Sequence, residues 1–356
     1  MIPHSKPTII EKKVILENIK KILNAEYLSE NIFVEKFEQK VCRFFETKYA
    51  IAVSSGTSAL HLALLALGVY ENSEVIIPSF TCAALLNAIL YIRAKPVIVD
   101  VDLDDFNIDF KEVKKYISKK TKAIIVPHMF GYPARNIKEI IELGIPVIED
   151  TTQSIGAKID GEMVGKFGII NVLSFYATKM ITTFGEGGII LTNNKKIYSI
   201  IKDLKEYDKK RKFKLRYNYK LSEVQAIMGL QQIEKIEYFV NKRRKLFEYY
   251  KNRLKNCKNI KIFEPLRNTE PVFYRFIIQI TGKENIDEII ANYKKFDIEV
   301  AKPIFLPLDK YYYGKFICKN SELLYSTTLS FPIYPSLNEK EVNYISKITK
   351  KNLKII

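Results

Sequence analysis

Short apolar segments rich in β-branched residues alternate with helical patterns between residues 49 and 192. The strand-like segments are bounded by Gly, Pro or Asp and read AIAVSS, EVIIP, KPVIVDV, KAIIVPH, IPVIED, VLSFY and GGIILT. Strands that are apolar throughout are buried on both faces, and strands separated by helices usually run parallel. The pattern therefore predicts an α/β domain with a mostly parallel seven-stranded sheet, in which ligands bind at the carboxyl ends of the strands.

The pattern changes where Ser222 and Gln225 have the spacing of a capping box. The apolar periodicity that follows predicts a long helix that continues or bends toward Leu254. Because this helix leads out of the first domain, we expect a large domain over residues 1–240 and a small α+β domain over residues 241–356. The elements expected in the small domain are strands at 272–280 and 298–305 and helices at 284–296 and from Asn338 onward.

Composition narrows the class of protein. Of the 356 residues, 47% are hydrophobic and 27% are charged, which is typical of a soluble globular chain. The most apolar stretch, Ser58 to Val69, is far shorter than the roughly 20 residues of a membrane-spanning helix. The first residues also lack the features of a signal peptide. We therefore expect a cytoplasmic protein with no membrane association.

Cysteines and histidines are few and scattered. They show no paired spacing of a disulfide framework or a zinc site, and no serine has the G-x-S-x-G surroundings of a hydrolase. We therefore expect free thiols and no metal centre, and we interpret the histidine of VPHMFG as either a cleft residue or a structural one. The residues concerned are Cys42, Cys82, Cys257, Cys318, His4, His61 and His128.

The net charge of +17 raises the possibility of a polyanionic partner, either nucleic acid or a phosphorylated small molecule. A lysine-rich coding composition, with lysines solvating helix faces, explains the charge equally well. The same choice applies to a basic run just before YNYK, which either forms a solvated loop or attracts a substrate diphosphate to the mouth of a site. The run consists of Lys209, Lys210, Arg211, Lys212, Lys214 and Arg216.

The segment SFYATKMITTFGEGG contains Lys179 just after a predicted buried strand. A lysine at such a strand end can have its pKa lowered by burial and become a Schiff-base nucleophile. Taken alone, the segment is also compatible with a surface lysine in a connection between strands.

The segment IPVIEDTTQSIGA places Asp150 at the carboxyl end of another predicted strand. A carboxylate at that position could keep the pyridine nitrogen of a pyridoxal cofactor protonated. The same residue could instead serve as a helix N-cap.

A third segment, SSGTSALHLAL, runs from a predicted strand through Gly56, Thr57 and Ser58 into a helix. Free backbone N–H groups and hydroxyls at a helix N-terminus form an anion site suited to a phosphate. The segment is neither a P-loop nor a G-x-G-x-x-G loop, and simple Ser/Thr capping would explain it as well.

Together these segments are much more specific than any one of them, and the chain resembles the DegT-type nucleotide-sugar aminotransferases. The resemblance covers nearly the whole chain. The motifs that carry it are IPHSKPTI, FEQKVCRFFETKYAIAVSSGTSALHLAL, PSFTCAALLNAIL, VPHMFGYPA, IEDTTQSIGA, SFYATK, FGEGG, YNYKLSEVQAIMGLQQIEKI and LSFPIYPSLNEKEV.

The resemblance implies an aspartate aminotransferase-like, fold-type I enzyme that depends on pyridoxal 5'-phosphate (PLP). It implies transfer of an amino group, usually from L-glutamate, through pyridoxamine phosphate to the keto group of a nucleoside-diphosphate deoxysugar. It also implies a homodimer with shared active sites. Some relatives that carry histidine at the lysine position act as dehydratases, so the lysine favours transamination.

Residue by residue, the resemblance assigns Lys179 to the Schiff base and to proton transfer. It assigns Asp150 to the pyridine nitrogen and Gln153 to the phenolic oxygen of the ring. Asn218 matches a residue that reaches the phosphate from the neighbouring subunit. The residues implied to bind the phosphate within one chain are Gly56, Thr57, Ser58 and Ser174.

Cys82 departs from the family pattern, because an aromatic residue or histidine commonly stands there and covers the ring. A polarizable sulfur, or a side chain from elsewhere, would take that place. The alternative from another functional class is a basic nucleic-acid-binding or regulatory protein on a catalytically silent version of the fold.

Overall fold

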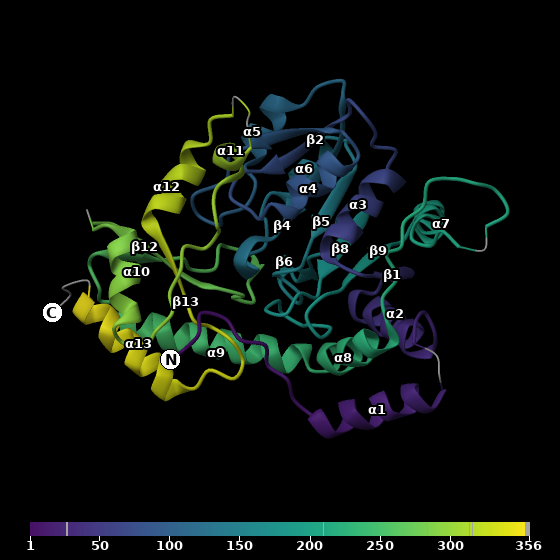
Figure 1. Ribbon diagram of the computed structural model, residues 1–356. Helices are drawn as coiled ribbons and strands as arrows, with labels where there is room; N and C mark the ends of the chain where they lie inside the picture. Colours follow the sequence, from purple (N-terminus) through teal and green to yellow (C-terminus); the bar gives the residue numbers. More distant parts are fainter. Residues whose placement is uncertain (26–27, 209, 283, 313, 315, 353–356) are drawn as a thin grey trace.

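The computed structural model describes residues 1–25, 28–208, 210–282, 284–312, 314 and 316–352. Its centre is a seven-stranded sheet with the order β1-β9-β8-β5-β4-β2-β3 (Figure 1). Every pairing is parallel except those of β9, which runs antiparallel to β1 and β8. The strands are β1 (Tyr49–Val53), β2 (Glu74–Pro78), β3 (Lys95–Val99), β4 (Thr121–Pro127), β5 (Val147–Asp150), β8 (Ile170–Ser174) and β9 (Gly188–Thr192). The predicted α/β fold and its mostly parallel sheet are confirmed.

Helices cover both faces of this sheet, and each face has its own apolar core. One core packs against α2 (Ile32–Phe45), α5 (Phe110–Tyr116), α6 (Ile137–Glu142) and α8 (Glu223–Glu234). The other packs against α3 (Gly56–Ala66), α4 (Ala84–Tyr91) and α7 (Lys195–Leu204). The outer helix α1 (Lys12–Ala25) lies on α8 through a small apolar cluster. Because both faces of the sheet are covered by apolar side chains, polar side chains converge at the ends of the strands.

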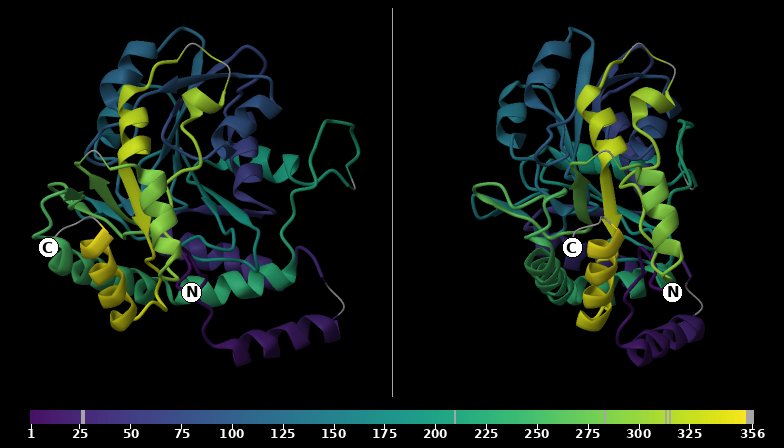
Figure 2. Two further views of the ribbon diagram at one scale, coloured as in Figure 1. Left: turned by 60° about the vertical axis from the view of Figure 1, so that its left-hand side comes forward. Right: turned by 90° about the vertical axis from the view of Figure 1, so that its left-hand side faces the viewer.

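A third apolar core lies mostly in the C-terminal part of the chain and also includes buried residues between 80 and 132 from the loops of the large sheet. It surrounds an antiparallel sheet of the order β10-β12-β13, and α13 lies along α9 (Figure 2). A further small sheet has the order β11-β6-β7. The elements are β10 (Ile260–Ile262), β12 (Phe276–Ile280), β13 (Thr328–Phe331), β6 (Lys158–Ile159), β7 (Glu162–Met163), β11 (Thr269–Glu270), α9 (Ile236–Leu254), α10 (Ile286–Lys294), α11 (Leu308–Tyr311), α12 (Lys319–Thr327) and α13 (Glu339–Asn352).

The predicted capping box is present, because Ser222 and Gln225 cap α8 through both reciprocal hydrogen bonds. The helical pattern is interrupted at Lys235 and continues as α9, which crosses the predicted domain boundary. That boundary stays a prediction. At the chain's start, Ile2 forms a bridge with Ile298 in the C-terminal part.

The prediction of a strand over residues 298–305 is wrong. Only isolated bridges form there, at Ile298 and Ala301. Pro303 has no N–H group to donate to a ladder, which is a physical reason for the chain to leave the sheet at this point. No described helix is long and apolar enough to cross a membrane.

A tight turn, η1 (Met129–Gly131), joins the large sheet to the C-terminal part. Val272 donates its N–H to the carbonyl of Gly131 at 3.0 Å, and Arg275 donates to that of Phe130 at 3.2 Å. Gly131 has φ +90°, and a Cβ there would lie 2.5 Å from the backbone nitrogen of Tyr274. Only glycine lets the two segments approach so closely.

Gly131→Ala should therefore destabilise the fold more than Gly144→Ala. Gly144 has φ +75°, but a Cβ added there would meet no described atom within 4 Å, so this variant reports the backbone cost alone. That cost is about 1–2 kcal/mol, and overpacking should add about 1–3 kcal/mol for Gly131. Thermal unfolding of both variants checks this expectation, and equal losses in Tm would show that the close approach is not limiting.

Candidate active site

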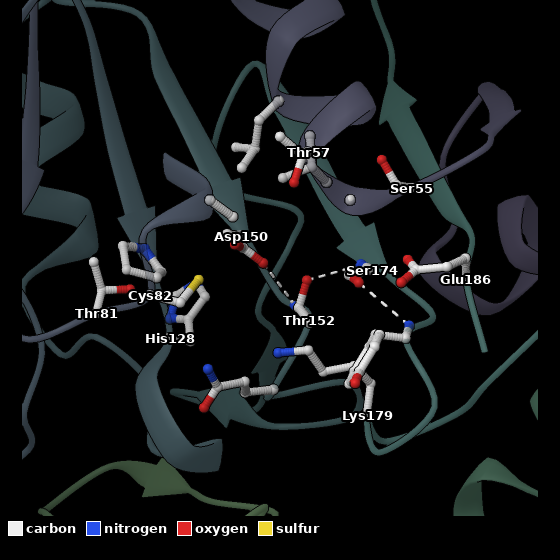
Figure 3. A pocket seen from close by; sticks show the side chains of 17 residues that line it. Ser55, Thr57, Thr81, Cys82, His128, Asp150, Thr152, Ser174, Lys179 and Glu186 are labelled. Carbon is white, nitrogen blue, oxygen red and sulfur yellow. Dashed lines mark hydrogen bonds between the residues drawn. The ribbon is translucent and has the colours of Figure 1, made fainter. Parts of the chain in front are cut away.

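A cavity of about 280 Å³ lies at the carboxyl ends of the parallel strands (Figure 3). It is bounded by the residues that follow β1, β2, β4, β5 and β8, and by the Gly-rich turn before β9. Its polar lining residues are Ser55, Thr57, Thr81, Cys82, His128, Asp150, Thr152, Gln153, Ser174, Tyr176, Lys179 and Glu186. Most of the residues singled out in the sequence are therefore brought together in one place.

Lys179 follows β8 in a turn in which its N–H donates to the carbonyl of Tyr176 at 2.9 Å. The side chain is half-buried and extends into the cavity toward Thr152 (Figure 3). Burial favours a lower pKa for Lys179, but the groups of Tyr274, Cys82 and Asp150 favour the ammonium form and raise the pKa above its ordinary value. The net shift is therefore opposite to the one that burial alone would produce.

Asp150 is the last residue of β5 and is half-buried. Its Oδ1 accepts a hydrogen bond from the backbone N–H of Thr152 at 3.0 Å. The hydroxyl oxygen of Thr152 in turn accepts from the N–H of Ser174 at 2.8 Å, which joins the ends of β5 and β8 (Figure 3). Asp150 thus accepts a local backbone hydrogen bond and also lines the cavity. A capping role and a role in the cavity therefore do not exclude each other.

Gln153 is oriented by an unusual backbone conformation. Its Oε1 accepts from the N–H of Phe130 at 2.9 Å, and Phe130 has φ +57°. Non-glycine residues in this region are strained and persist where the surroundings fix them. Because the amide oxygen is engaged by the backbone, the amide NH₂ is left as the donor on the cavity side.

The N-terminus of α3 forms the upper wall of the cavity. Ser55 caps the helix by accepting from the N–H of Ser58 at 3.0 Å, and the N–H groups of Gly56 and Thr57 have no partner within the helix. A Cβ at Gly56 would lie 2.5 Å from the Cβ of Ser174. The missing side chain lets α3 begin in close contact with Ser174, and the free N–H groups at its first turn form a cradle that suits an anion such as a phosphate.

Two predicted residues do not line the cavity. Ser58 is buried and bonds through its hydroxyl to those of Ser54 and Ser55, at 3.1 and 2.8 Å, so it supports the cap. Asn218 is exposed and does not line the cavity of its own chain. Cys82 is exposed and lines the cavity as expected from its position in the sequence.

His128 lines the cavity but has both ring nitrogens engaged. Its Nδ1 accepts from the N–H of Ala134 at 2.9 Å, so its Nε2–H donates to the fully buried Glu149 at 2.9 Å. Glu149 also accepts from the N–H groups of Gly165 and Gly168. The pair supports the cavity wall. Within the described ranges, no group of three or more His, Cys, Asp or Glu residues could hold a metal ion.

A second lobe of similar volume, about 280 Å³, opens beside Lys179. It shares Thr81, Cys82, Gln153 and Lys179 with the first lobe, while its far side comes from the C-terminal part of the chain. The added residues are Ala83, Met129, Phe130, Tyr274, Arg275, Pro303, Ile304, Phe305, Leu306, Leu308 and Tyr311.

Sequence reasoning missed several lining residues. Ser55, Thr152, Tyr176 and Glu186 each lie inside or beside one of the motifs, so their proximity to those motifs was an available signal. Arg275 lies in a segment interpreted only as a strand, and no local pattern distinguishes it there.

Comparisons with known proteins identify the family of the chain. The model of the DegT/DnrJ/EryC1/StrS aminotransferase family matches residues 9–350. GDP-perosamine synthase of Escherichia coli O157:H7 is 32% identical, over 97% of this chain and 96% of its own. A UDP-4-amino-4,6-dideoxy-N-acetyl-beta-L-altrosamine transaminase of Campylobacter jejuni is 31% identical, over 97% of this chain and 96% of its own.

Among solved structures, NtdA from Bacillus subtilis with bound cofactor PMP superimposes with a TM-score of 0.88 at 26% identity. The match covers 98% of this chain and 83% of that one. The chain belongs to the DegT/DnrJ/EryC1/StrS aminotransferase family.

Proposed function

We propose that this aminotransferase moves an amino group from L-glutamate to the keto group of a nucleoside-diphosphate-linked deoxysugar, with PLP as its cofactor. The observation that carries the proposal is the position of Lys179, whose amine extends into a cavity between a helix N-terminus and the carboxylate of Asp150. The family supports aminotransfer, and the relatives named for GDP- and UDP-linked amino sugars support the substrate class.

The groups that line the first lobe fit PLP. The cradle of Gly56 and Thr57 N–H groups, with the hydroxyl of Ser174, would bind the phosphate. Asp150 would hold a proton on the ring nitrogen, the NH₂ group of Gln153 would face the phenolic oxygen, and Cys82 stands where a ring cover is expected. When bound, PLP supplies the electron sink that lets an amino group pass between an amino acid and a keto compound.

The protein's own part in proton transfer centres on the Nζ of Lys179. Its raised pKa means that the free amine holds a proton at neutral pH. Burial favours a higher pKa for Tyr274, but Arg275, Lys179 and Arg243 together lower it. Tyr274 therefore stabilises the charge of Lys179, and the three cations around its ring lower the pKa of its own hydroxyl.

The second functional class, a silent nucleic-acid-binding or regulatory protein, is not favoured. A chain released from catalysis would have no reason to keep an oriented amine, a carboxylate and an open anion cradle in one cavity. The basic run also has a local role, because Lys214 and Arg216 pair with Asp203 at 3.3 and 3.0 Å. Lys209 of that run lies outside the described residues.

The function is tested by incubating PLP-loaded protein with L-glutamate and a panel of 3-keto and 4-keto nucleotide sugars. We expect one amino-sugar nucleotide and an equivalent of 2-oxoglutarate, identified by mass spectrometry and NMR. Borohydride reduction and peptide mapping should place the pyridoxyl group on Lys179. Lys179→Ala should lose turnover, and Lys138→Ala, which removes a surface lysine paired with Asp160, should not.

No amination of any keto sugar, with normal bleaching of the cofactor by L-glutamate, would refute the sugar substrate. A pyridoxyl group on another lysine would refute the role of Lys179.

Asp150 and Glu149 are neighbours with opposite expected phenotypes. Asp150→Asn should abolish turnover with little change in Tm, because the side-chain oxygen that accepts from Thr152 is retained while the negative charge in the cavity is lost. Glu149→Gln should lower Tm, because the NH₂ group would face at least one of three donors in a fully buried site, at a cost of about 1–3 kcal/mol. Activity and Tm are measured on both variants. The larger loss of activity should occur in Asp150→Asn and the larger loss of Tm in Glu149→Gln. Losses of the same size in both variants would contradict these roles.

We further propose a dimer in which Asn218 serves the partner's site. The segment after α7 extends away from the body of the chain (Figure 1) and exposes the apolar side chains of Tyr207, Phe213 and Leu215. Phe213 is 99% exposed, which is unfavourable for a large apolar side chain unless another surface covers it. Asn218 follows directly, and Arg211, also exposed, would be carried with it toward the partner's substrate.

Mixing a Lys179→Ala chain with an Asn218→Ala chain tests the shared site. If each site uses Lys179 of one chain and Asn218 of the other, the hybrid dimer has one site with both defects and one intact site. Activity should then recover toward half that of a wild-type dimer per hybrid. Each variant alone must be severely impaired, and subunit exchange must be verified by tagged chains. No recovery after exchange would place Asn218 outside the partner's site.

A further inference from the structure

Arg275 stands out because it is half-buried, lines the second lobe and has no acidic partner among the described residues. Its side chain contacts Tyr274, whose ring it covers at 4.6 Å and whose hydroxyl it approaches at 3.3 Å. A guanidinium withdrawn from water normally needs an anion to offset its desolvation. The position of Arg275 therefore suggests that a ligand supplies the missing negative charge.

The backbone holds Arg275 at this place. Its N–H donates to the carbonyl of Phe130 at 3.2 Å, and β12 begins at the next residue. The fully buried Arg243 on α9 donates to the carbonyls of Tyr274 and Ile333, so the preceding residue is fixed as well. The side chain therefore belongs to a rigid part of the cavity wall.

The surrounding charges make this lobe electropositive. Arg275, Arg243 and Lys179 all lie near the ring of Tyr274, at 4.6, 5.7 and 5.8 Å from its centroid. Together they lower the pKa of Tyr274 even though burial opposes the change. No acidic side chain of the described residues lines the second lobe, whereas Asp150 and Glu186 line the first. An anion is thus favoured in the second lobe.

The shape of the lobe distinguishes between anions. Its volume of about 280 Å³ is at the lower end of ligand pockets, so it suits a group of amino-acid size better than a nucleoside diphosphate. Arg275 lines only the second lobe, whereas Lys179 lies where the two lobes join. Apolar side chains of Met129, Phe130 and Ile304 line the same lobe. These surroundings fit a dicarboxylic amino acid. Its reacting carbon would lie beside Lys179, its methylene chain against the apolar side chains and its terminal carboxylate at Arg275.

We propose that Arg275 binds the side-chain carboxylate of the amino donor and so selects a dicarboxylic amino acid. This inference rests on the proposed function and deepens it. The planar guanidinium matches a carboxylate with two parallel hydrogen bonds, which a lysine cannot reproduce. L-glutamate is therefore preferred over L-alanine, which has no second carboxylate to satisfy Arg275.

The test measures the two half-reactions separately, by the absorbance of the cofactor under single-turnover conditions. Arg275→Met should slow the reaction with L-glutamate roughly ten- to hundredfold, through its apparent affinity, because a charge-assisted pair is lost. The reaction with L-alanine and the return reaction with the sugar nucleotide should change by a smaller factor, because they lose only the effect of the Arg275 charge on Lys179 and not a carboxylate contact. Arg275→Lys should fall between wild type and Arg275→Met for glutamate.

Arg267→Met is the matched control, because it removes the same charge from an exposed loop outside both lobes. An independent measurement uses protein without cofactor. Glutarate should bind to wild type and to Arg267→Met by calorimetry, but not to Arg275→Met, and butyrate should bind to none of them. Unchanged Tm values for Arg275→Met and Arg275→Lys show that the variants are folded.

Equal effects of Arg275→Met on both amino donors would overturn the inference, as would an effect confined to the sugar nucleotide, which would assign Arg275 to the diphosphate. Glutarate binding that survives in Arg275→Met would also overturn it. These outcomes differ from failure of the proposed function, in which wild-type protein would react with glutamate and aminate no keto sugar.

Discussion

The active site depends on a close approach of backbone at the carboxyl edge of the large sheet. The turn after β1 contacts the start of β9 so tightly that a Cβ at Gly188 would lie 2.3 Å from the carbonyl oxygen of Ser55. Gly56 meets Ser174 in the same way. Because no side chains intervene, α3 begins with its first N–H groups facing the cavity. The anion cradle is thus a consequence of how strands pack, and the hydrogen bonds of Ser55 and Ser58 stabilise the helix end that supplies it.

The charges of the site are balanced across two lobes built from different parts of the chain. The sheet edge supplies Asp150 and the cradle, and the C-terminal part supplies Arg275 and Tyr274. Lys179 lies where the lobes meet, so charged groups of both lobes act on its pKa. Burial and Arg275 lower this pKa, and the groups of Tyr274, Cys82 and Asp150 raise it. A new anion in the second lobe would offset Arg275, and a cationic ring nitrogen beside Asp150 would reduce the support for the lysine's charge. We therefore expect the pKa of Lys179 to change when either lobe is occupied.

Much of the fold and of the first lobe follows from local sequence. Seven apolar segments became the seven strands, because alternation of buried strands and helices leaves few other arrangements. Asp150, Ser174 and Lys179 converge since the carboxyl ends of parallel strands share one edge. The direction of the lysine's pKa shift could not be predicted, because it depends on Tyr274 and Cys82, which come from distant segments. The strand expected at 298–305 failed for a related reason: a β-like composition does not fix a partner strand.

The second lobe shows most clearly what local sequence leaves undetermined. Arg275 precedes β12 in an apolar run, and its place in the cavity results from the turn at Gly131, whose missing side chain lets residues 272–275 approach the sheet edge. The residues proposed to bind the cofactor and the residue proposed to bind the donor therefore come from different parts of the fold. The residues proposed to hold the cofactor are fixed by the packing of the large sheet, whereas Arg275, proposed to bind the donor, is fixed by the backbone contacts between residues 272–275 and η1. Changes at position 275 or at residues 303–311 would therefore alter the second lobe without altering the cradle, and loss of Arg275 would also remove a charge that lowers the pKa of Lys179.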